Sequence, residues 1–464
     1  MSADIRNYGG WRERRGFGLA GLSGRQTAAA LGAVLVLLAV ALVRPGFVGV
    51  LGIPLGLGVG LVVLRIRDEA LISWFGRHGA WVLNRRRGWT TARTIDTGEF
   101  PGVLAGMTLL EVQDPAGPSV GLTWDQRTRS LTAIIPVQPL GLTLVGGEQV
   151  HEWVSGWGDW LSHLGYLPGV KHVVVTVHTG PGPPTHPLEP TSAGETSVVQ
   201  EVIRQLDDDL EQPGPAQYSR TLVSITVDVP DRSHLESAGS DLVELCSALG
   251  STLGRCGVSV LATMCPQDIV QWVRGVYEPQ YAGAAASTHW ADGRPTSTEE
   301  AWGHYQHDGA VSAAYVWDET PGQSVPPDVL ARLLGPSDYH KRVSLVYEPM
   351  AAHIAVREVD RQAAAAAFRS QYRRRLGRDE TARERADLHR AEQTATDQVG
   401  GAGLVDVGLY AVASATDIVE LRRCTTDLEN RAGESRIRLR RNYGAQAATF
   451  ASTTALGFVP RRGL

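Results

Sequence analysis

The sequence predicts a membrane-anchored α+β protein, in which an N-terminal two-helix transmembrane hairpin precedes cytoplasmic α+β domain(s) with a long charged helix. Three observations support this fold class. Two charge-free apolar runs, residues 27–43 and 46–64, lie near the N-terminus. Strand-like and helix-like patterns alternate from about residue 101 onward. Between Phe368 and Glu392, eight arginines and five acidic residues are interspersed, which is typical of a solvent-exposed helix.

Each apolar run is long enough to cross a membrane. A spanning helix needs roughly 17–25 apolar residues. Only Arg44-Pro45-Gly46 joins the two runs, so the second helix returns beside the first. Two other interpretations stay open. The segment 39–41 has the small residues of a signal-peptide cleavage site, although a second apolar run follows it directly. In the second alternative, the two runs form a buried helical hairpin of a soluble domain, although charge-free runs of this length favour a membrane.

Arginine sets the predicted orientation of the hairpin. Short flanks rich in Arg stay on the cytoplasmic side, and the turn of the hairpin contains only Arg44. The flanking residues that set this topology are Arg14, Arg15 and Arg25 before the hairpin and Arg65, Arg67, Arg85, Arg86 and Arg87 after it. We therefore expect a multi-pass protein of the inner cell membrane with both termini in the cytoplasm.

Small residues recur at helical spacing in both apolar runs. Gly52, Gly56 and Gly60 are four residues apart in the second run, and Gly32 is paired in the same way with Ala28 in the first. Small residues let two helices approach closely where lipid removes the hydrophobic driving force. We expect these glycines to pack the hairpin internally, and a homo-oligomeric contact between copies of the chain is the alternative.

Composition limits the class of protein. The chain of 464 residues is 43% hydrophobic, which is sufficient for sizeable cores, and its net charge of -5 is unremarkable for this length. Lys171 and Lys341 are the only lysines, so nearly all basic charge is arginine. The four cysteines lack the Cys-x-x-Cys spacing, which fits free thiols in a reducing cytoplasm.

Helix and strand patterns alternate along the remainder of the chain. The predicted elements, in order, are helix 68–83, strands 107–112, 120–124 and 130–137, helix 148–164, strand 170–179, helix 197–211, strand 218–229, helix 237–253, strand 258–264, helix 266–276, strand 310–317, helix 327–334, strand 341–347, a long helix or helical pair over 350–399, strand 403–414, helix 415–428, strand 435–441 and helix 445–453. The first three strands form an antiparallel meander, and 218–264 forms a β-α-β unit. Helix 68–83 either continues the second membrane helix or lies along a surface.

Two of the predicted helices permit more than one role. The helix over 148–164 carries Trp153, Trp157 and Trp160 on one face. Such a stripe usually packs in a core, and contact with a membrane or a partner is the alternative. The signs of charge alternate in the charged helix, so we favour a solvated surface, and direct nucleic-acid binding is not favoured.

These patterns divide the chain into successive parts. They are an Arg-rich cytoplasmic tail (1–26), the transmembrane hairpin (27–64), a juxtamembrane segment (65–100), an α+β cytoplasmic domain (101–349), the long charged helix or helical pair (350–400), and a closing β-α-β unit with the C-terminal tail (401–464).

The sequence offers no starting point for catalysis. A nucleotide-binding P-loop requires a Gly-Lys dipeptide, and none is present. No zinc-protease motif and no zinc-like Cys/His pattern occurs. His304 and His307 have ligand-like spacing, but a metal would need a further ligand from a distant loop. We therefore expect a protein that is not an enzyme, with no catalytic, cofactor-binding or metal-binding residue.

The order of the parts resembles that of known secretion proteins. The hairpin resembles the small PrgI-like inner-membrane component of type IV secretion and conjugation machines. The α+β region, with its charged helix and closing unit, resembles the non-catalytic N-terminal half of the VirB-class secretion ATPase. That half ends in a Gln…Phe…Leu-Pro-x-Gly segment ahead of the P-loop core. Here Gln446 and Phe450 are followed by Ala455-Leu456-Gly457 in place of the Leu-Pro segment.

The whole layout resembles a family of actinobacterial integral membrane proteins from type IV secretion-like, conjugative clusters. This resemblance implies a non-enzymatic inner-membrane scaffold or adaptor that docks a separate secretion ATPase and a polytopic channel protein of the same apparatus. The resemblance implies no catalytic residue and no cofactor for this chain. A rival resemblance is to the two-helix membrane component of an ESX-type VII secretion apparatus. A membrane-tethered enzyme of unknown chemistry is a third interpretation.

Overall fold

The structure is a computed structural model with two compact units. It describes residues 31–32, 65–66, 69–88, 90–93, 99–114, 117–141, 145–167, 169–182, 217–280, 287, 289–319, 325–351, 353–361, 364 and 403–460. The smaller unit comprises residues 11–91 and 462–464, and the larger comprises residues 1–10 and 92–461. Each unit is considered by itself below.

The described part of the smaller unit is a strand pair and a helix. Strand β1 (Arg65–Ile66) pairs antiparallel with β2 (Glu69–Ala70), and helix α3 (Leu71–Arg86) follows directly. The strand pair separates α3 from the second apolar run. The expectation that 68–83 continues a membrane helix is therefore wrong, because the backbone reverses direction immediately before the helix begins.

Most of the predicted hairpin, 27–64, lies outside the described residues. Leu31 and Gly32 are the exceptions, and both are helical. Within the ranges given above, no helix is both long enough and apolar enough to cross a membrane.

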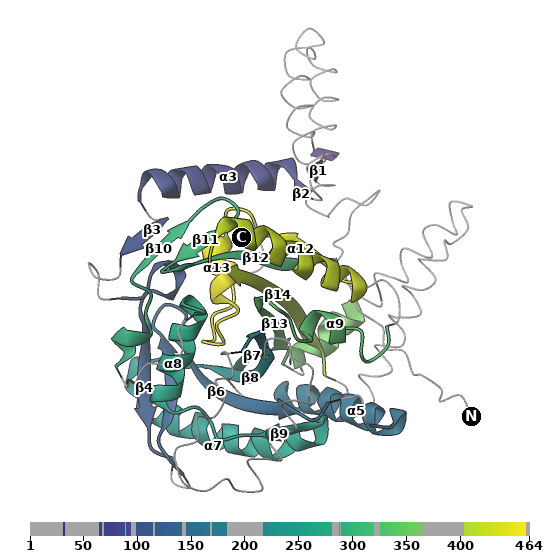
Figure 1. Ribbon diagram of the computed structural model, residues 1–464. Helices are drawn as coiled ribbons and strands as arrows, with labels where there is room; N and C mark the ends of the chain where they lie inside the picture. The colour runs from purple at the N-terminus through teal and green to yellow at the C-terminus, as the bar shows by residue number, and fades with distance from the viewer. Residues whose placement is uncertain are drawn as a thin grey trace, which may run out of the picture. The chain divides into compact units, whose positions relative to one another are not determined.

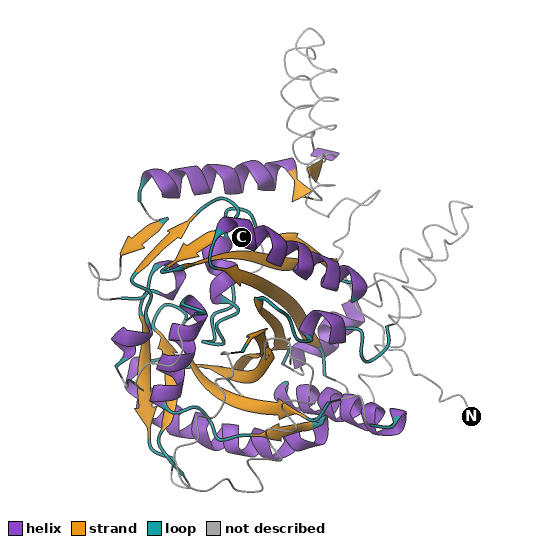
Figure 2. Ribbon diagram, viewed as in Figure 1, coloured by secondary structure: helices purple, strands orange, loops and turns teal. Residues whose placement is uncertain are grey.

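The larger unit is built on one sheet of thirteen described strands (Figures 1 and 2). The order is β3-β10-β11-β12-β14-β13-β7-β8-β6-β5-β4, with β15 also beside β12 and β9 also beside β6. The bounds are β3 Thr91–Arg93, β4 Met107–Val112, β5 Val120–Asp125, β6 Ser130–Pro139, β7 Val170–Pro181, β8 Gln217–Asp228, β9 Val258–Val260, β10 Ser297–Glu300, β11 Tyr305–His307, β12 Ala310–Glu319, β13 His340–Pro349, β14 Val405–Ala415 and β15 Arg438–Arg441. Pairing from β10 to β4 is antiparallel throughout.

The helices cover both faces of this sheet. Their bounds are α5 Gly147–Leu164, α7 Leu235–Leu253, α8 Pro266–Tyr277, α9 Ala331–Leu334, α12 Ile418–Glu434 and α13 Gln446–Ala451, with short 3-10 turns η2 Gly102–Leu104, η3 Arg232–His234, η4 Gly254–Cys256 and η5 Trp290–Gly293. Helices α5 and α7 pack on the outer face of strands β5 to β8, and α9 and α12 pack on the outer face of β12 to β14. The sheet curls around α8 and α13 on the inner face (Figure 1).

The second half of the sheet repeats the topology of the first. In the first half, β5 and β6 form a hairpin, β7 and β8 follow, and α7 returns the chain to β9 beside β6. In the second half, β11 and β12 form a hairpin, β13 and β14 follow, and α12 returns the chain to β15 beside β12. Helices α8 and α13 then complete the two halves on the same inner face.

A pseudo-two-fold axis between β7 and β13 relates the two halves. These strands pair antiparallel at the centre of the sheet, where Thr179 lies opposite Lys341 and Val173 lies opposite Tyr347. Rotating one half onto the other exchanges these two pairs. The axis therefore passes through the middle of the β7–β13 ladder, and the two ends of this ladder are equivalent positions in the two halves.

The structure confirms the α+β fold class and the predicted meander of β4, β5 and β6. The two predicted β-α-β units are each split, because β6 lies between β8 and β9, and β12 lies between β14 and β15. Strand β14 sits between β12 and β13. Residues 401–464 therefore complete the sheet of 101–349. Helix 197–211 and most of the charged segment 350–400 lie outside the described residues; within the latter, 353–361 are helical.

The tryptophan stripe, which was predicted to pack in a core, lies in the larger unit. Trp160 is buried in α5 and its indole N–H donates to the Leu249 carbonyl, while Trp157 stacks on it. Most of the C-terminal segment is also buried against the inner face, since Gln446 and Phe450 are fully enclosed. The Gln446 side chain accepts from the backbone N–H of Ala314 on β12 and donates to its carbonyl.

Gly457 is the tightest point of this C-terminal segment. Its φ is +83°, and a Cβ there would lie 1.9 Å from Thr132 Oγ1 and 2.9 Å from Thr226 Oγ1. Gly457→Ala is expected to destabilise the domain by about 3 kcal/mol, because it combines backbone strain with a clash. Gly433→Ala on α12 is the matched control, since a Cβ there meets nothing within 4 Å, and it should change stability by less than about 1 kcal/mol. Thermal unfolding followed by circular dichroism would compare them, and equal stability of the two variants would contradict the expectation.

Candidate binding site

Polar side chains form rows across the inner face of the sheet, because residues opposite each other on neighbouring strands share a face. One row places Arg220 of β8 opposite His178 of β7, and His178 opposite Arg342 of β13. The next row, nearer the end of the ladder, contains Gly180 of β7 and His340 of β13. These side chains come from strands far apart in the sequence.

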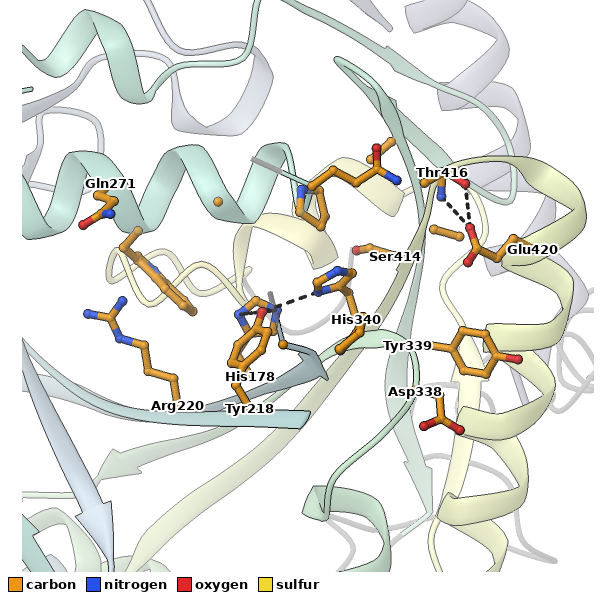
Figure 3. A pocket seen from close by; sticks show the side chains of 18 residues that line it. His178, Tyr218, Arg220, Gln271, Asp338, Tyr339, His340, Ser414, Thr416 and Glu420 are labelled. Carbon is orange, nitrogen blue, oxygen red and sulfur yellow. Dashed lines mark hydrogen bonds between the residues drawn. The ribbon is translucent and has the colours of Figure 1, made fainter. Parts of the chain in front are cut away.

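A cavity of about 650 Å³ opens at this end of the β7–β13 ladder. Its walls come from β7, β8 and α8 of the first half and from β13, β14 and α12 of the second. Figure 3 shows Arg220 and Gln271 on one side, Asp338 and Glu420 on the other, and His178, Tyr218 and His340 between them. This volume lies in the range of small-molecule sites. Residues of both halves line the cavity, and neither half makes it alone.

Three rings in the centre of the cavity are hydrogen-bonded to one another. The Tyr218 hydroxyl lies 2.9 Å from His178 Nε2 and 3.4 Å from His340 Nδ1 (Figure 3). A Cβ on Gly180 would lie 2.6 Å from His340 Nδ1. The glycine between the Tyr218 and His340 positions therefore leaves the space in which these two rings meet.

Both imidazoles are held in the neutral form. Burial lowers the pKa of His178 well below its usual value, and the positive charge of Arg342 lowers it further. Burial also lowers the pKa of His340 to about 4, with Arg342 acting in the same direction. Burial raises the pKa of the Tyr218 hydroxyl to about 12. At neutral pH these three groups exchange hydrogen bonds without carrying charge.

Arg342 lies beneath the cavity with 1% of its surface exposed. Its guanidinium lies 4.7 Å from the Phe450 ring centroid and donates to Thr453 Oγ1 and to the Val276 carbonyl, both at 3.4 Å. Its Nη2 has no hydrogen-bond partner. Burial lowers the pKa of Arg342 to about 10, and phenol groups, including that of Tyr218, act in the other direction. No carboxylate of the described chain pairs with this buried cation.

Arg220 supplies a second cation at the cavity wall. Its guanidinium lies 5.4 Å from the Trp272 ring centroid, and no described residue hydrogen-bonds to it or forms an ion pair with it. Burial lowers the pKa of Arg220, and the Asp268 carboxylate opposes this effect. The carboxylates on the far wall are engaged, since Glu420 accepts from the Thr416 N–H and hydroxyl groups and Asp338 accepts from Gln217.

The opposite end of the β7–β13 ladder carries the equivalent row. His172 is the counterpart of His340, and the hydrogen-bonded pair Thr132–Thr226 is the counterpart of Ser312–Ser414. At that end the Gly457 carbonyl accepts a hydrogen bond from His172 Nε2 at 3.0 Å. The chain's own C-terminal segment therefore fills one of two equivalent positions, and the other is open.

This arrangement is suited to binding rather than to covalent chemistry. It offers two guanidinium groups, neutral imidazoles and a phenol, while the hydrogen-bonded pair Ser312–His307 is buried and does not line the cavity. Across the described residues, no group of three or more His, Cys, Asp or Glu is placed to hold a metal ion. His307, one of the pair with ligand-like spacing, is buried with its ring nitrogens bonded to the Tyr277 carbonyl and the Ser312 hydroxyl.

A nucleophile-elbow spacing, Gly117-Pro118-Ser119-Val120-Gly121, occurs in the chain but does not form an elbow. It connects the antiparallel strands β4 and β5. A nucleophile elbow requires a strand-to-helix turn that exposes the serine above a sheet. The spacing alone therefore carries no catalytic meaning here.

The residues selected from the sequence lie elsewhere. Arg85 and Arg86 form the last turn of α3 and Arg87 follows it, all exposed, where they complement the helix dipole. Arg65 lies in β1 and Gly32 is helical. The others fall outside the described residues: Gly52, Gly56, Gly60, Arg14, Arg15, Arg25 and Arg67.

Sequence reasoning missed the cavity residues. A signal was present, because His172, Thr176 and His178 alternate with valines in one strand, and His340, Arg342 and Ser344 alternate in another. Such alternation usually indicates a solvated sheet face. It became a buried polar face because α8 and the C-terminal segment cover it. Comparison with known proteins adds no further signal, since no protein-family model matches the chain and no curated protein is found similar to it.

Removing the Tyr218 hydroxyl tests the three-ring cluster. Tyr218→Phe leaves a fully buried His178 nitrogen without its partner, so we expect a loss of about 1–3 kcal/mol in unfolding free energy. Tyr339→Phe is the control, because Tyr339 lines the same cavity without a hydrogen bond from its hydroxyl. Denaturant unfolding of both variants measures the difference, and an unaffected Tyr218→Phe would show that the cluster contributes nothing to stability.

His172 should make stability dependent on pH. Burial lowers its pKa from 6.5 to about 4 in the folded protein. The unfolded chain takes up this proton below pH 6.5 and the folded chain does so only below about 4. The contribution of neutral His172 to the free energy of unfolding is therefore fully present above pH 6.5. It falls by roughly 3 kcal/mol as the pH is lowered to about 4. His172→Gln should be correspondingly less sensitive between pH 7 and pH 4.5 in denaturant unfolding, and parallel losses in both proteins would contradict this assignment.

Proposed function

We propose that this chain is a non-enzymatic, membrane-anchored scaffold of a type IV secretion-like, conjugative apparatus, and that it docks a separate secretion ATPase. The observation that carries the proposal is the pair of charge-free apolar runs at 27–43 and 46–64 with arginines on both flanks. This pattern favours two spanning helices with both termini in the cytoplasm. The larger unit would then lie at the inner face of the inner membrane.

The chemistry of the larger unit supports a scaffold. The sequence has no Gly-Lys dipeptide and therefore no P-loop. Among the described residues, no group of His, Cys, Asp or Glu is placed to hold a metal ion. The segment with the ATPase-like order, Gln446 to Gly457, packs into the inner face of the sheet and completes the domain core. A separate chain would then supply the motor, and a polytopic channel protein would be the second partner.

The test combines topology with partner binding in the full-length chain. A membrane-impermeant maleimide should label the half-buried thiols of Cys256 and Cys265 only after the cells are permeabilised. A Gly46→Cys variant should be labelled in intact cells, because Gly46 lies in the predicted turn. In detergent, the chain should co-elute with the purified ATPase of its own gene cluster, and it should hydrolyse no ATP alone.

Three results would overturn this proposal. Labelling of Cys256 and Cys265 in intact cells would place the larger unit outside. ATP hydrolysis by the chain alone, without association with the ATPase, would indicate a membrane-tethered enzyme. Association with a motor of an ESX-type VII apparatus in place of the type IV-like ATPase would assign the scaffold to that rival machine.

A further inference from the structure

Two arginines at the cavity end of the β7–β13 ladder form no ion pair with a carboxylate of the described residues. Arg342 is enclosed without a carboxylate partner and has an unpaired Nη2. Arg220, in the same row, has no hydrogen bond to any described residue. Burying a cation without a counter-charge is costly. The cost falls if an anion occupies the space next to this row.

The geometry of the cavity also fits a ligand. Arg220 presents a free planar fork of N–H donors at the wall, which matches the oxygen atoms of a phosphate or carboxylate group. The Tyr218 hydroxyl and the Ser414 side chain add neutral polar groups, and the Trp272 ring adds an apolar surface. A volume of about 650 Å³ holds a molecule well beyond the size of a bare inorganic ion.

The comparison of the two equivalent ends supports an occupant. At the His172 end, a carbonyl oxygen of the C-terminal segment lies over the polar row. At the His340 end, the imidazole contacts the Tyr218 hydroxyl and lines the cavity. The C-terminal segment thus covers the His172 position, whereas the His340 position opens into the cavity, next to the Arg220–His178–Arg342 row.

The far wall limits the charge that the ligand can carry. Asp338 and Glu420 lie across the cavity from Arg220 (Figure 3). Glu420 follows β14, which is three strand spacings, or roughly 14 Å, from β8. Asp338 hydrogen-bonds to Gln217 at the first residue of β8. A polyanion long enough to reach the far wall would meet these carboxylates and be repelled. A molecule with one anionic group, placed at the Arg220 end, would not be repelled by these carboxylates.

We propose that this cavity binds an organic molecule with a single anionic group, a phosphate monoester or a carboxylate, held at the Arg220–His178–Arg342 row. The anionic oxygens accept from the Arg220 guanidinium, and the remainder of the ligand lies against Trp272 toward the mouth of the cavity. Arg342 contributes its charge from beneath the row. The inference goes beyond the scaffold role and stands whether or not the chain docks an ATPase.

Titration calorimetry on the full-length chain in detergent tests the site. The probes are inorganic phosphate, AMP, glycerol 3-phosphate and benzoate, each to 10 mM, with ATP as the polyanion. At least one of the organic monoester or carboxylate probes should bind more tightly than inorganic phosphate and ATP. AMP would indicate a nucleotide source for the phosphate group, glycerol 3-phosphate a lipid headgroup, and benzoate a carboxylate ligand.

Arg220→Gln should weaken that binding roughly 10- to 100-fold, because it removes a charge-assisted hydrogen-bond donor. Arg232→Gln is the matched control, since Arg232 is exposed and does not line the cavity, and it should leave the affinity within about two-fold. Glu420→Gln removes a negative charge from the far wall. It should increase the affinity for ATP and should not lower the affinity for the monoanionic probe. This variant keeps the test valid if Arg220→Gln fails to fold.

Three outcomes would overturn the proposal. The first is that no probe binds the wild-type chain at 10 mM. The second is that Arg220→Gln, when folded, binds the probe as the wild type does. The third is that ATP binds more tightly than every monoanion and is unaffected by Glu420→Gln. None of these results bears on the labelling or the ATPase association, so the two proposals fail independently.

Discussion

Arg342 holds a positive charge at the centre of the sheet, where water does not reach and no described carboxylate balances it. Such a group is tolerated only when polar atoms and polarisable rings surround it. The inner face meets this requirement with the Phe450 ring, the Thr453 hydroxyl and the Val276 carbonyl. The C-terminal segment supplies two of these groups, Phe450 and Thr453. Burial keeps the neighbouring imidazoles neutral, and the charge of Arg342 acts in the same direction.

The repeated topology explains why the polar face exists in two copies. Each half places a histidine at the start of its central strand and a pair of hydroxyl side chains beside it. The chain has one C-terminal segment, which covers the His172 copy through the Gly457 carbonyl. The asymmetry of the site therefore comes from a single segment laid across a nearly symmetric sheet.

Much of the secondary structure was predictable, because periodicity is a local property of the sequence. The strand pattern of residues 130–137 and the apolar stripe of α5 are examples, and both elements are confirmed. The cavity was not predictable in the same way. His178 and Arg342 meet only because β7 pairs with β13 in one register, and a single sequence does not reveal long-range register. The polar face of these strands is buried only because α8 and the C-terminal segment cover it.

The central ladder has a mechanical consequence. The connection after β7 leaves the sheet at one end and the connection after β13 leaves it at the other, because the two strands are antiparallel. If partners pulled on these two connections, the load would run along the strands in opposite directions. The hydrogen bonds between the strands lie across that direction, so all of them would share the load at once and would not open one by one. Under this loading, the β7–β13 ladder that joins the two halves would resist extension and transmit force between them.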